Sequence, residues 1–421
     1  MHSTESMLVS RVQPGGSERK SARDAHPDGP AVACLEGTWH VRSYAAVRQV
    51  LRDADATRQA GFNAELAART GLRPPVLFED GREHREHRTA IARFFTPSAV
   101  EERYRTLIEA ASEALVARLE RAGRADLGQL SLELAMQVAA QVVGLTESRT
   151  PRMARRLEGI LSLERLERLP PWRRPAEMLR VQFHVARFFI QDVMPAIRAR
   201  RKRPREDVIS HLLAKGYRNA EILIECITYG AAGMATTREF IAMAAWHLLE
   251  HDALRRDYLA GDGGERHRML HEILRLEPVV GRLYRRAVQD LDVEHDATTS
   301  RIPAGALIAL DIRAANADAA AVGAEPLRLQ PERERAPRVQ ESALSFGDGA
   351  HRCPGAFIAI AESDAFLTRL LRLPLRVTGA PRLAWNDLIE GYEVRGLEVV
   401  LAECRDEPAS DAPARSGTAA A

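Results

Sequence analysis

The most constraining feature of the sequence is a short stretch near its C-terminal end, residues 345–355, which reads SFGDGAHRCPG. Its glycines permit a tight turn with left-handed backbone. Pro354 follows Cys353 directly, and proline suits the first turn of a helix. The residues after this stretch are mostly apolar and helix-forming. The pattern predicts a loop that presents one sulfur at a helix N-terminus, where the pKa of a thiol is lowered.

Three interpretations of this cysteine compete. A lone cysteine is usually buried and inert, and a zinc site needs four ligands, which no nearby Cys or His supplies at ligand spacing. The full pattern Phe-Gly-x-Gly-x-His-x-Cys-x-Gly is nevertheless intact, and it resembles the haem-thiolate loop of the cytochrome P450 family. The resemblance implies that Cys353 is the metal ligand, and that Phe346, Gly347, His351 and Gly355 contact the cofactor, haem b.

The overall composition argues against several other classes. Lys and Arg total 60 against 58 Asp and Glu, a net charge of +2, which indicates no nucleic-acid or anionic-membrane partner. The 4 cysteines show no paired spacing, which indicates a reducing, cytoplasmic setting. Residues 1–29 contain no apolar signal segment, and no apolar run reaches the roughly 18 residues that span a bilayer. We therefore expect a cytoplasmic protein without a membrane anchor.

Helical patterns dominate the chain, so we expect a mainly α protein with a smaller β region. Residues 1–30 read as a disordered N-terminal tail, and residues 405–421 as a disordered C-terminal tail. Residues 37–43 alternate and predict a strand, which residues 44–51 follow with helical spacing. The resemblance implies that residues 31–404 form a single cytochrome P450 domain, with a triangular helical part and small sheets.

A charged helical segment contains His84 and Arg88, which lie four residues apart and therefore share one helix face. A solvated, salt-bridged face would explain such a run equally well. In the resembled family, however, His-x-x-x-Arg at this distance before Phe-Thr-Pro contacts the haem propionates, and cations suit carboxylates. Arg285, in an Arg-x-Ala pattern, carries over as a further propionate contact.

Residues 221–251 predict one long helix whose middle, residues 230–237, is built of small residues and two threonines. Such a patch indicates either close helix packing or a bulky group passing nearby. The family motif (Ala/Gly)-Gly-x-(Asp/Glu)-Thr-(Thr/Ser) matches here at Ala232 and Gly233, implied cofactor contacts. It also matches at Thr236 and Thr237, implied catalytic residues.

One position of that motif departs from the family. Ala235 replaces the usual acid, which puts ordinary proton delivery in doubt. Glu239, three residues beyond Thr236, is a possible substitute, and a local distortion of the helix would change its reach. Thr236 itself is implied to hydrogen-bond iron-bound dioxygen.

Two further segments are interpreted through the resemblance. Glu272 and Arg275 lie three apart on one helix face and resemble the family's structural Glu-x-x-Arg pair, with Arg333 as its third member. Arg282 lies in a segment expected to form a wall of the substrate pocket. If it points inward it would bind an anionic substrate, and otherwise it faces solvent.

The resemblance implies a monooxygenase that oxidises a small secondary metabolite with O2. No Gly-x-Gly-x-x-Gly fingerprint for flavin or nicotinamide is visible, so a separate ferredoxin and ferredoxin reductase would supply electrons to a monomeric enzyme. Ala235 keeps two alternatives open: oxidative coupling or ring closure without oxygen insertion, and peroxide-driven oxidation. A haem sensor without turnover is a third alternative, but such a protein has no need of Thr236.

Overall fold

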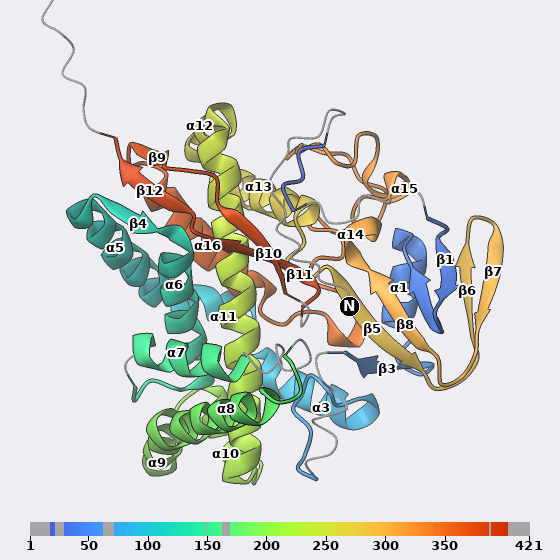
Figure 1. Ribbon diagram of the computed structural model, residues 1–421, viewed down its shortest axis with the longest axis horizontal. Coiled ribbons are helices and arrows are strands. Elements are labelled where there is room, and N and C mark those ends of the chain that lie inside the picture. The colour runs from blue at the N-terminus through green and yellow to red at the C-terminus, as the bar shows by residue number, and fades with distance from the viewer. Residues whose placement is uncertain are drawn as a thin grey trace, which may run out of the picture.

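The computed structural model describes residues 17–21, 29–61, 71–148, 150–161, 169–386 and 389–402. Figure 1 shows a helical region on one side and a β-rich region on the other, with the long helix α11 (Asn219–Glu250) between them. The mainly α fold with smaller sheets is therefore confirmed. No helix of the described residues is both long and apolar enough to span a membrane.

The helical region packs around α11. Its core is continuous from α5 to α13 and includes the fully buried Trp246 and Phe188. The helices are α3 (Gly81–Ala92), α4 (Pro97–Ala99), α5 (Arg105–Ala122), α6 (Leu127–Val143), α7 (Thr150–Leu161), α8 (Arg174–Phe188), α9 (Met194–Lys202), α10 (Val208–Ala214), α12 (Asp252–Ala260), α13 (Gly263–Leu276) and α16 (Ala356–Leu370).

In the β-rich region the main sheet has the strand order β1-β2-β8-β5-β3. Strands β2 and β8 are parallel, and the other neighbours are antiparallel. The sheet packs on the short helices α1 (Tyr44–Arg52), α14 (Ile312–Ala315) and α15 (Ala319–Val322). Its strands are β1 (Val32–Leu35), β2 (Thr38–Val41), β3 (Thr57–Ala60), β5 (Arg282–Ala287) and β8 (Leu307–Asp311). The strand and helix predicted for residues 37–51 are confirmed as β2 and α1.

Smaller sheets complete the described part of the chain. Strands β6 (Leu291–His295) and β7 (Thr298–Ile302) form one hairpin, and β10 (Arg382–Asn386) and β11 (Gly391–Arg395) form another. Strands β4 (Arg124–Asp126), β12 (Glu398–Leu401) and β9 (Leu375–Val377) form the remaining sheet. The second hairpin lies against α11, because the backbone N–H of Val394 donates to Glu239 at 2.6 Å.

Part of the predicted N-terminal tail is ordered. Residues 17–21 lie at the end of α13, where the Arg19 side chain donates to the carbonyl of Leu276 at 2.6 Å. The backbone N–H of Ser21 donates to the fully buried carboxylate of Glu277 at 3.2 Å. Charged groups therefore hold this segment of the expected tail to the domain. Residues 1–16, 22–28 and the predicted tail 405–421 lie outside the described residues.

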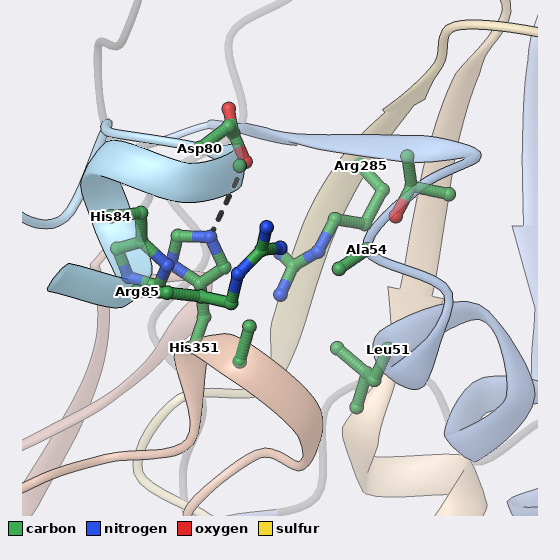
Figure 2. Close-up of a pocket in the computed structure, with 10 residues that line it drawn as sticks. Leu51, Ala54, Asp80, His84, Arg85, Arg285 and His351 are labelled. Atoms are coloured by element: carbon green, nitrogen blue, oxygen red, sulfur yellow. Dashed lines mark hydrogen bonds and ion pairs between the residues drawn. The ribbon is translucent and has the colours of Figure 1, made fainter. Parts of the chain in front are cut away.

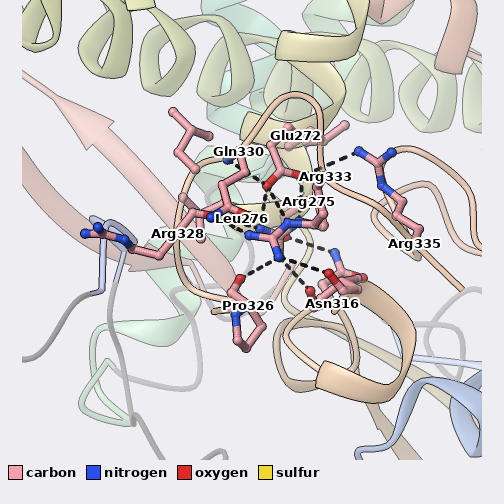
Figure 3. A network of polar contacts seen from close by, with 12 residues as sticks. Glu272, Arg275, Leu276, Asn316, Pro326, Arg328, Gln330, Arg333 and Arg335 are labelled. Carbon is pink, nitrogen blue, oxygen red and sulfur yellow. Dashed lines mark hydrogen bonds and ion pairs between the residues drawn. The ribbon is translucent and has the colours of Figure 1, made fainter. Parts of the chain in front are cut away.

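A buried ionic network ties α13 to the loop that precedes the cysteine (Figure 3). Glu272 and Arg275 are fully buried and joined by two hydrogen bonds of 2.8 Å, and Arg333 donates to the same carboxylate at 3.0 Å. Arg333 also donates to the carbonyls of Val322 and Ala324. The predicted third member of the network is confirmed.

The same network extends to the cysteine loop through Asn316. Arg275 donates to the Asn316 carbonyl at 2.8 Å. The Asn316 side chain accepts from the N–H of Leu344 at 2.9 Å and donates to the hydroxyl of Ser345 at 2.7 Å. The ion pairs therefore fix where the loop begins.

We predict that Glu272→Gln lowers the free energy of unfolding by about 3–5 kcal/mol, because two buried guanidinium groups lose their compensating charge. The measurement is chemical denaturation followed by far-ultraviolet circular dichroism. Glu332→Gln is the matched control, since Glu332 is exposed and its ion pair with Arg268 spans 3.5 Å. We expect the control to change stability by no more than about 0.5 kcal/mol. Equal stabilities of the two variants would contradict the structural role of the network.

Candidate functional site

The cysteine loop is a tight turn held by its own backbone. The N–H of Cys353 donates to the carbonyl of Phe346 at 2.8 Å, and the N–H of Gly347 donates to the carbonyl of Leu344 at 2.8 Å. Gly347 and Gly349 have φ of 67° and 69°, as the sequence predicts. A Cβ on Gly349 would lie 2.2 Å from the carbonyl oxygen of Leu51. Only glycine therefore lets the loop approach α1 so closely.

An aspartate within the loop anchors it to α1, and the sequence analysis missed this residue. Asp348 accepts hydrogen bonds of 2.9 Å from both Arg48 and Arg52. These arginines lie four residues apart on one face of α1, which was the available signal. Their charges hold the pKa of Asp348 below its ordinary value, against the opposing effect of burial.

The sulfur lies just before the N-terminus of α16, as predicted. Cys353 is half-buried, and α16 begins at Ala356. Burial raises the pKa of its thiol, while a hydrogen bond from Gly355 and the charges of Arg88 and Arg352 act in the opposite direction. The expected lowering of the thiol pKa is therefore wrong for the protein alone, because desolvation outweighs the helix terminus. A coordinated metal ion would remove that proton.

A polar corner lies beside the loop, where α1, α3, β5 and the cysteine loop meet (Figure 2). His84 and His351 stack with ring centroids 4.0 Å apart, and His351 Nε2 lies 3.4 Å from Asp80 Oδ1. Arg285 and both histidines line a cavity of about 50 Å³. That space suits a carboxylate-sized group, not a whole macrocycle. The structure thus brings together two of the three predicted propionate contacts, His84 and Arg285, with the predicted cofactor contact His351.

The charges of this corner are poorly compensated. Arg285 is buried and donates to the side chain of Gln59 at 2.6 Å, and burial lowers its pKa to about 10. Arg88, the third predicted propionate contact, donates to the carbonyl of Arg352. Within the described residues neither guanidinium has a carboxylate partner. Burial, together with His351 and Arg88, lowers the pKa of His84 to about 3, and its Nε2 atom is buried without a hydrogen-bond partner.

These observations fit an anionic group in the corner. Buried cations and polar atoms are normally paired, and a pair of carboxylates would satisfy Arg88, Arg285 and His84 together. The propionates of a haem are such a pair. The donor set therefore fits the predicted cofactor, and Cys353 remains the predicted ligand of its iron.

The middle of α11 presents an open face. Ala232 is exposed although its helix is otherwise largely buried, and Thr236, one turn further, is half-buried. The helix is unbroken, and the Thr236 hydroxyl donates to the Ala232 carbonyl at 2.6 Å. The helix distortion considered from the sequence is not seen.

Gly233 and Thr237 lie elsewhere on α11. A Cβ on Gly233 would meet Ala139 of α6 at 3.2 Å, so this glycine permits close helix packing. Thr237 is buried and faces Glu362 of α16. Burial raises the pKa of Glu362 to about 8, and a hydrogen bond with Thr237 acts in the opposite direction. The predicted small-residue patch thus packs against two elements, α6 at Gly233 and α16 at Thr237.

Glu239 does not replace the acid missing at position 235. Its carboxylate is buried, accepts from the N–H of Val394 at 2.6 Å and pairs with Arg238 and Arg395, both at 2.7 Å. Arg282, the other open question, pairs with Glu390 at 2.6 Å. Its charge is therefore compensated within the protein.

Comparisons with known proteins agree with this geometry. The family model described as Cytochrome P450 matches residues 267–373. A Xylella fastidiosa protein assigned as cytochrome P450 133B2 is 31% identical over 215 residues, which cover 49% of this chain and 50% of that protein. Cytochrome P450 130 of Mycobacterium tuberculosis is 27% identical over 325 residues, which cover 74% of this chain and 75% of that protein. The match thus spans half the length of the first relative and three quarters of the second.

The fold is also found among solved structures. A mutant of P450 EryK in complex with erythromycin B superposes with a TM-score of 0.71 at 22% identity, covering 90% of this chain and 95% of that one. The fold and the cysteine loop together define a haem-thiolate protein. In its matched segment, its relatives and its fold the chain is similar to the cytochrome P450 family, whose cofactor is haem b, and the donor set of the site fits that cofactor.

We predict that Cys353→Ala abolishes the long-wavelength absorption band that carbon monoxide gives with reduced haem-thiolate proteins, because the axial sulfur is lost. The measurement is a reduced carbon monoxide difference spectrum of the purified holoprotein. Cys34→Ala is the control, since Cys34 is an exposed free cysteine far from the loop in sequence, and it should keep the band. A Cys353→Ala protein that retains the band would refute thiolate ligation.

Proposed function

We propose that this protein is a monooxygenase that inserts one oxygen atom of O2 into a small secondary metabolite. The observation that carries the proposal is the open face of α11, where Ala232 is exposed in the middle of a core helix and Thr236 presents a hydroxyl. A protein that only binds haem has no need of an alcohol there. When bound, haem with an axial thiolate supplies the chemistry of O–O bond cleavage.

The remaining site residues divide into ligand, anchor and packing roles. Cys353 would hold the iron, and His84, Arg88, Arg285 and His351 would pair with the propionates. Phe346, Gly347 and Gly355 of the loop and Ala232 of α11 would contact the cofactor. Thr236 would hold a proton near the reacting oxygen, for which its hydroxyl must turn away from the Ala232 carbonyl.

Electrons would come from a separate ferredoxin and ferredoxin reductase, which we propose to dock near Arg352. Its side chain donates to Gln340 at 3.0 Å, and its Nε is buried without a partner. Electrostatic steering of an acidic carrier protein toward this basic site would favour encounter. The proposal includes a monomeric enzyme in the cytoplasm, which free cysteines in the described residues suit.

A natural-product substrate is supported by one structural neighbour, which was solved with erythromycin B. The sequence also predicts walls of the substrate pocket at residues 57–80 and 147–205. Of these, residues 62–70, 149 and 162–168 lie outside the described residues. A screen of candidate metabolites by their shift of the haem spectrum, followed by product mass, tests the function. A product heavier by one oxygen atom supports it, whereas no substrate-dependent oxygen incorporation from labelled O2 would refute it.

A second candidate function is oxidation without oxygen insertion, by coupling or ring closure, or with peroxide as oxidant. Ala235 favours it, and so does the engagement of Glu239 with Arg238 and Arg395. One-electron steps rely less on a proton relay than oxygen insertion does. A product lighter by two hydrogen atoms, or turnover with hydrogen peroxide alone, would support this candidate over the first.

We predict that Thr236→Ala lowers product formed per electron consumed by roughly tenfold, because a positioned proton donor is lost. The measurement compares NADPH used, peroxide released and product formed with any compound that shifts the haem spectrum. Thr228→Ala is the matched control, since the Thr228 hydroxyl makes the same backbone hydrogen bond on α11, to Ile224 at 2.9 Å. Unchanged coupling in Thr236→Ala, with the control also unchanged, would remove this alcohol from the reaction.

A further inference from the structure

A stripe of polar and small side chains runs along one face of α11. Glu225, Tyr229, Ala232 and Thr236 are spaced four, three and four residues apart, so they share one face of the unbroken helix. Ala232 and Thr236 form its open part. Glu225 and Tyr229 continue the same face toward the N-terminus of the helix.

Glu225 is a buried acid with a free oxygen. It is 1% exposed, and its Oε1 accepts from the N–H of Val76 at 3.0 Å. Its Oε2 is buried without a hydrogen-bond partner. Burial raises the pKa of Glu225 to about 8, the Val76 hydrogen bond lowers it, and the charge of Glu79 raises it. The carboxyl group therefore carries a proton at neutral pH.

Tyr229 presents a second unpartnered atom one turn away. Its hydroxyl is buried without a hydrogen-bond partner, and its ring stacks on Phe95 with centroids 6.1 Å apart. Burial and the charge of Glu225 raise its pKa well above the ordinary value, while Arg88 acts in the opposite direction. The phenol therefore keeps its proton. Two such atoms on adjacent turns of one helix face suit an ordered water shared between them.

Further titratable groups act electrostatically on this pair. Glu79 and His87 are joined at 2.9 Å, and the Tyr217 hydroxyl lies 3.4 Å from the same ring nitrogen. Arg73, which is exposed, lies over the Tyr217 ring at 4.2 Å. The titratable groups that act on Glu225 or Tyr229 are Glu79, Tyr217, Cys226 and Arg88.

We propose that Glu225 and Tyr229 form a water-linked proton source that supplies the protons which Ala235 does not. The inference rests on the proposed function. In each transfer the Tyr229 hydroxyl releases its proton toward Thr236 and takes up the carboxyl proton of Glu225. Glu225 becomes a carboxylate, and solvent restores its proton through Tyr217 and His87. Tyr229 and Thr236 are about 10 Å apart along the helix, a distance that ordered water molecules bridge.

The first test observes the proton directly and needs no turnover. Infrared spectra of the holoprotein should show a protonated-carboxyl band that disappears with a midpoint near pH 8, the pKa expected for Glu225. The band should be absent in Glu225→Gln and shifted in Tyr229→Phe. Because burial gives Glu362 the same expected pKa, the spectra are recorded as differences against Glu362→Gln. If Glu225→Gln and wild type have the same bands, the proposal fails.

The second test follows the fate of electrons without added substrate. A surrogate ferredoxin and ferredoxin reductase deliver electrons from NADPH, and the share recovered as hydrogen peroxide instead of water is measured. Loss of a proton donor should slow the path to water by roughly tenfold, so peroxide should dominate in Glu225→Gln and Tyr229→Phe.

Glu221→Gln is the matched control for this experiment. Glu221 lies one turn before Glu225 and also accepts a loop N–H, from Arg73 at 3.5 Å, but it pairs with Arg218 at 2.8 Å. The hydrogen bond with Arg218 lowers the pKa of Glu221 to about 2, against burial, so it stores no proton. We expect this variant to release the same share of electrons as hydrogen peroxide as the wild type does; we call this share the partitioning.

The outcomes separate this inference from the function on which it rests. Wild-type partitioning in Glu225→Gln and Tyr229→Phe would overturn the proposal, and a loss in Glu362→Gln would then assign the protons to the Thr237 face of α11. If Glu225→Gln does not fold, Tyr229→Phe tests the same relay by both measurements. A wild-type protein without a haem-thiolate spectrum would instead refute the proposed function.

Discussion

The structure depends on a buried carboxylate that holds two guanidinium groups. Glu272 is removed from water together with Arg275 and Arg333, and this costs desolvation energy that only close hydrogen bonds offset. Those guanidiniums in turn satisfy backbone carbonyls of the loop before the cysteine. Such a network tolerates little displacement of its parts. It therefore fixes the start of the cysteine loop through Asn316.

The site combines a rigid loop with buried polar groups that have no carboxylate partner among the described residues. Asp348 and its two arginines lock the loop to α1, so the position of the sulfur is set before anything binds. In the polar corner, by contrast, the charges are not paired. Arg285 and His84 are buried and have no carboxylate partner among the described residues. A dianionic cofactor would relieve that imbalance. Binding and folding are then coupled, because the cofactor stabilises the state that it fits.

Different faces of helix α11 contact different elements. Gly233 and Gly230 bring α6 and α7 close, Thr237 and Glu239 are engaged with other elements, and the Ala232 face stays open. The loss of an acid at position 235 therefore cannot be repaired by Glu239, whose charge stabilises the hairpin β10–β11. The buried acid of the open face lies at Glu225, about three turns from Thr236.

The local features of the fold could be predicted from the sequence. The glycines around Cys353, the start of α16 and the shared helix face of Glu272 and Arg275 follow from spacing within a few residues, because backbone sterics and helical periodicity act at that range. The tertiary structure alone decided what depends on distant segments and on burial. Asp348 meets arginines about 300 residues away, residues 17–21 are held by Glu277, and desolvation reverses the expected pKa of Cys353 and raises that of Glu225. Desolvation depends on every atom that packs around a group, so no short pattern in the sequence can report it.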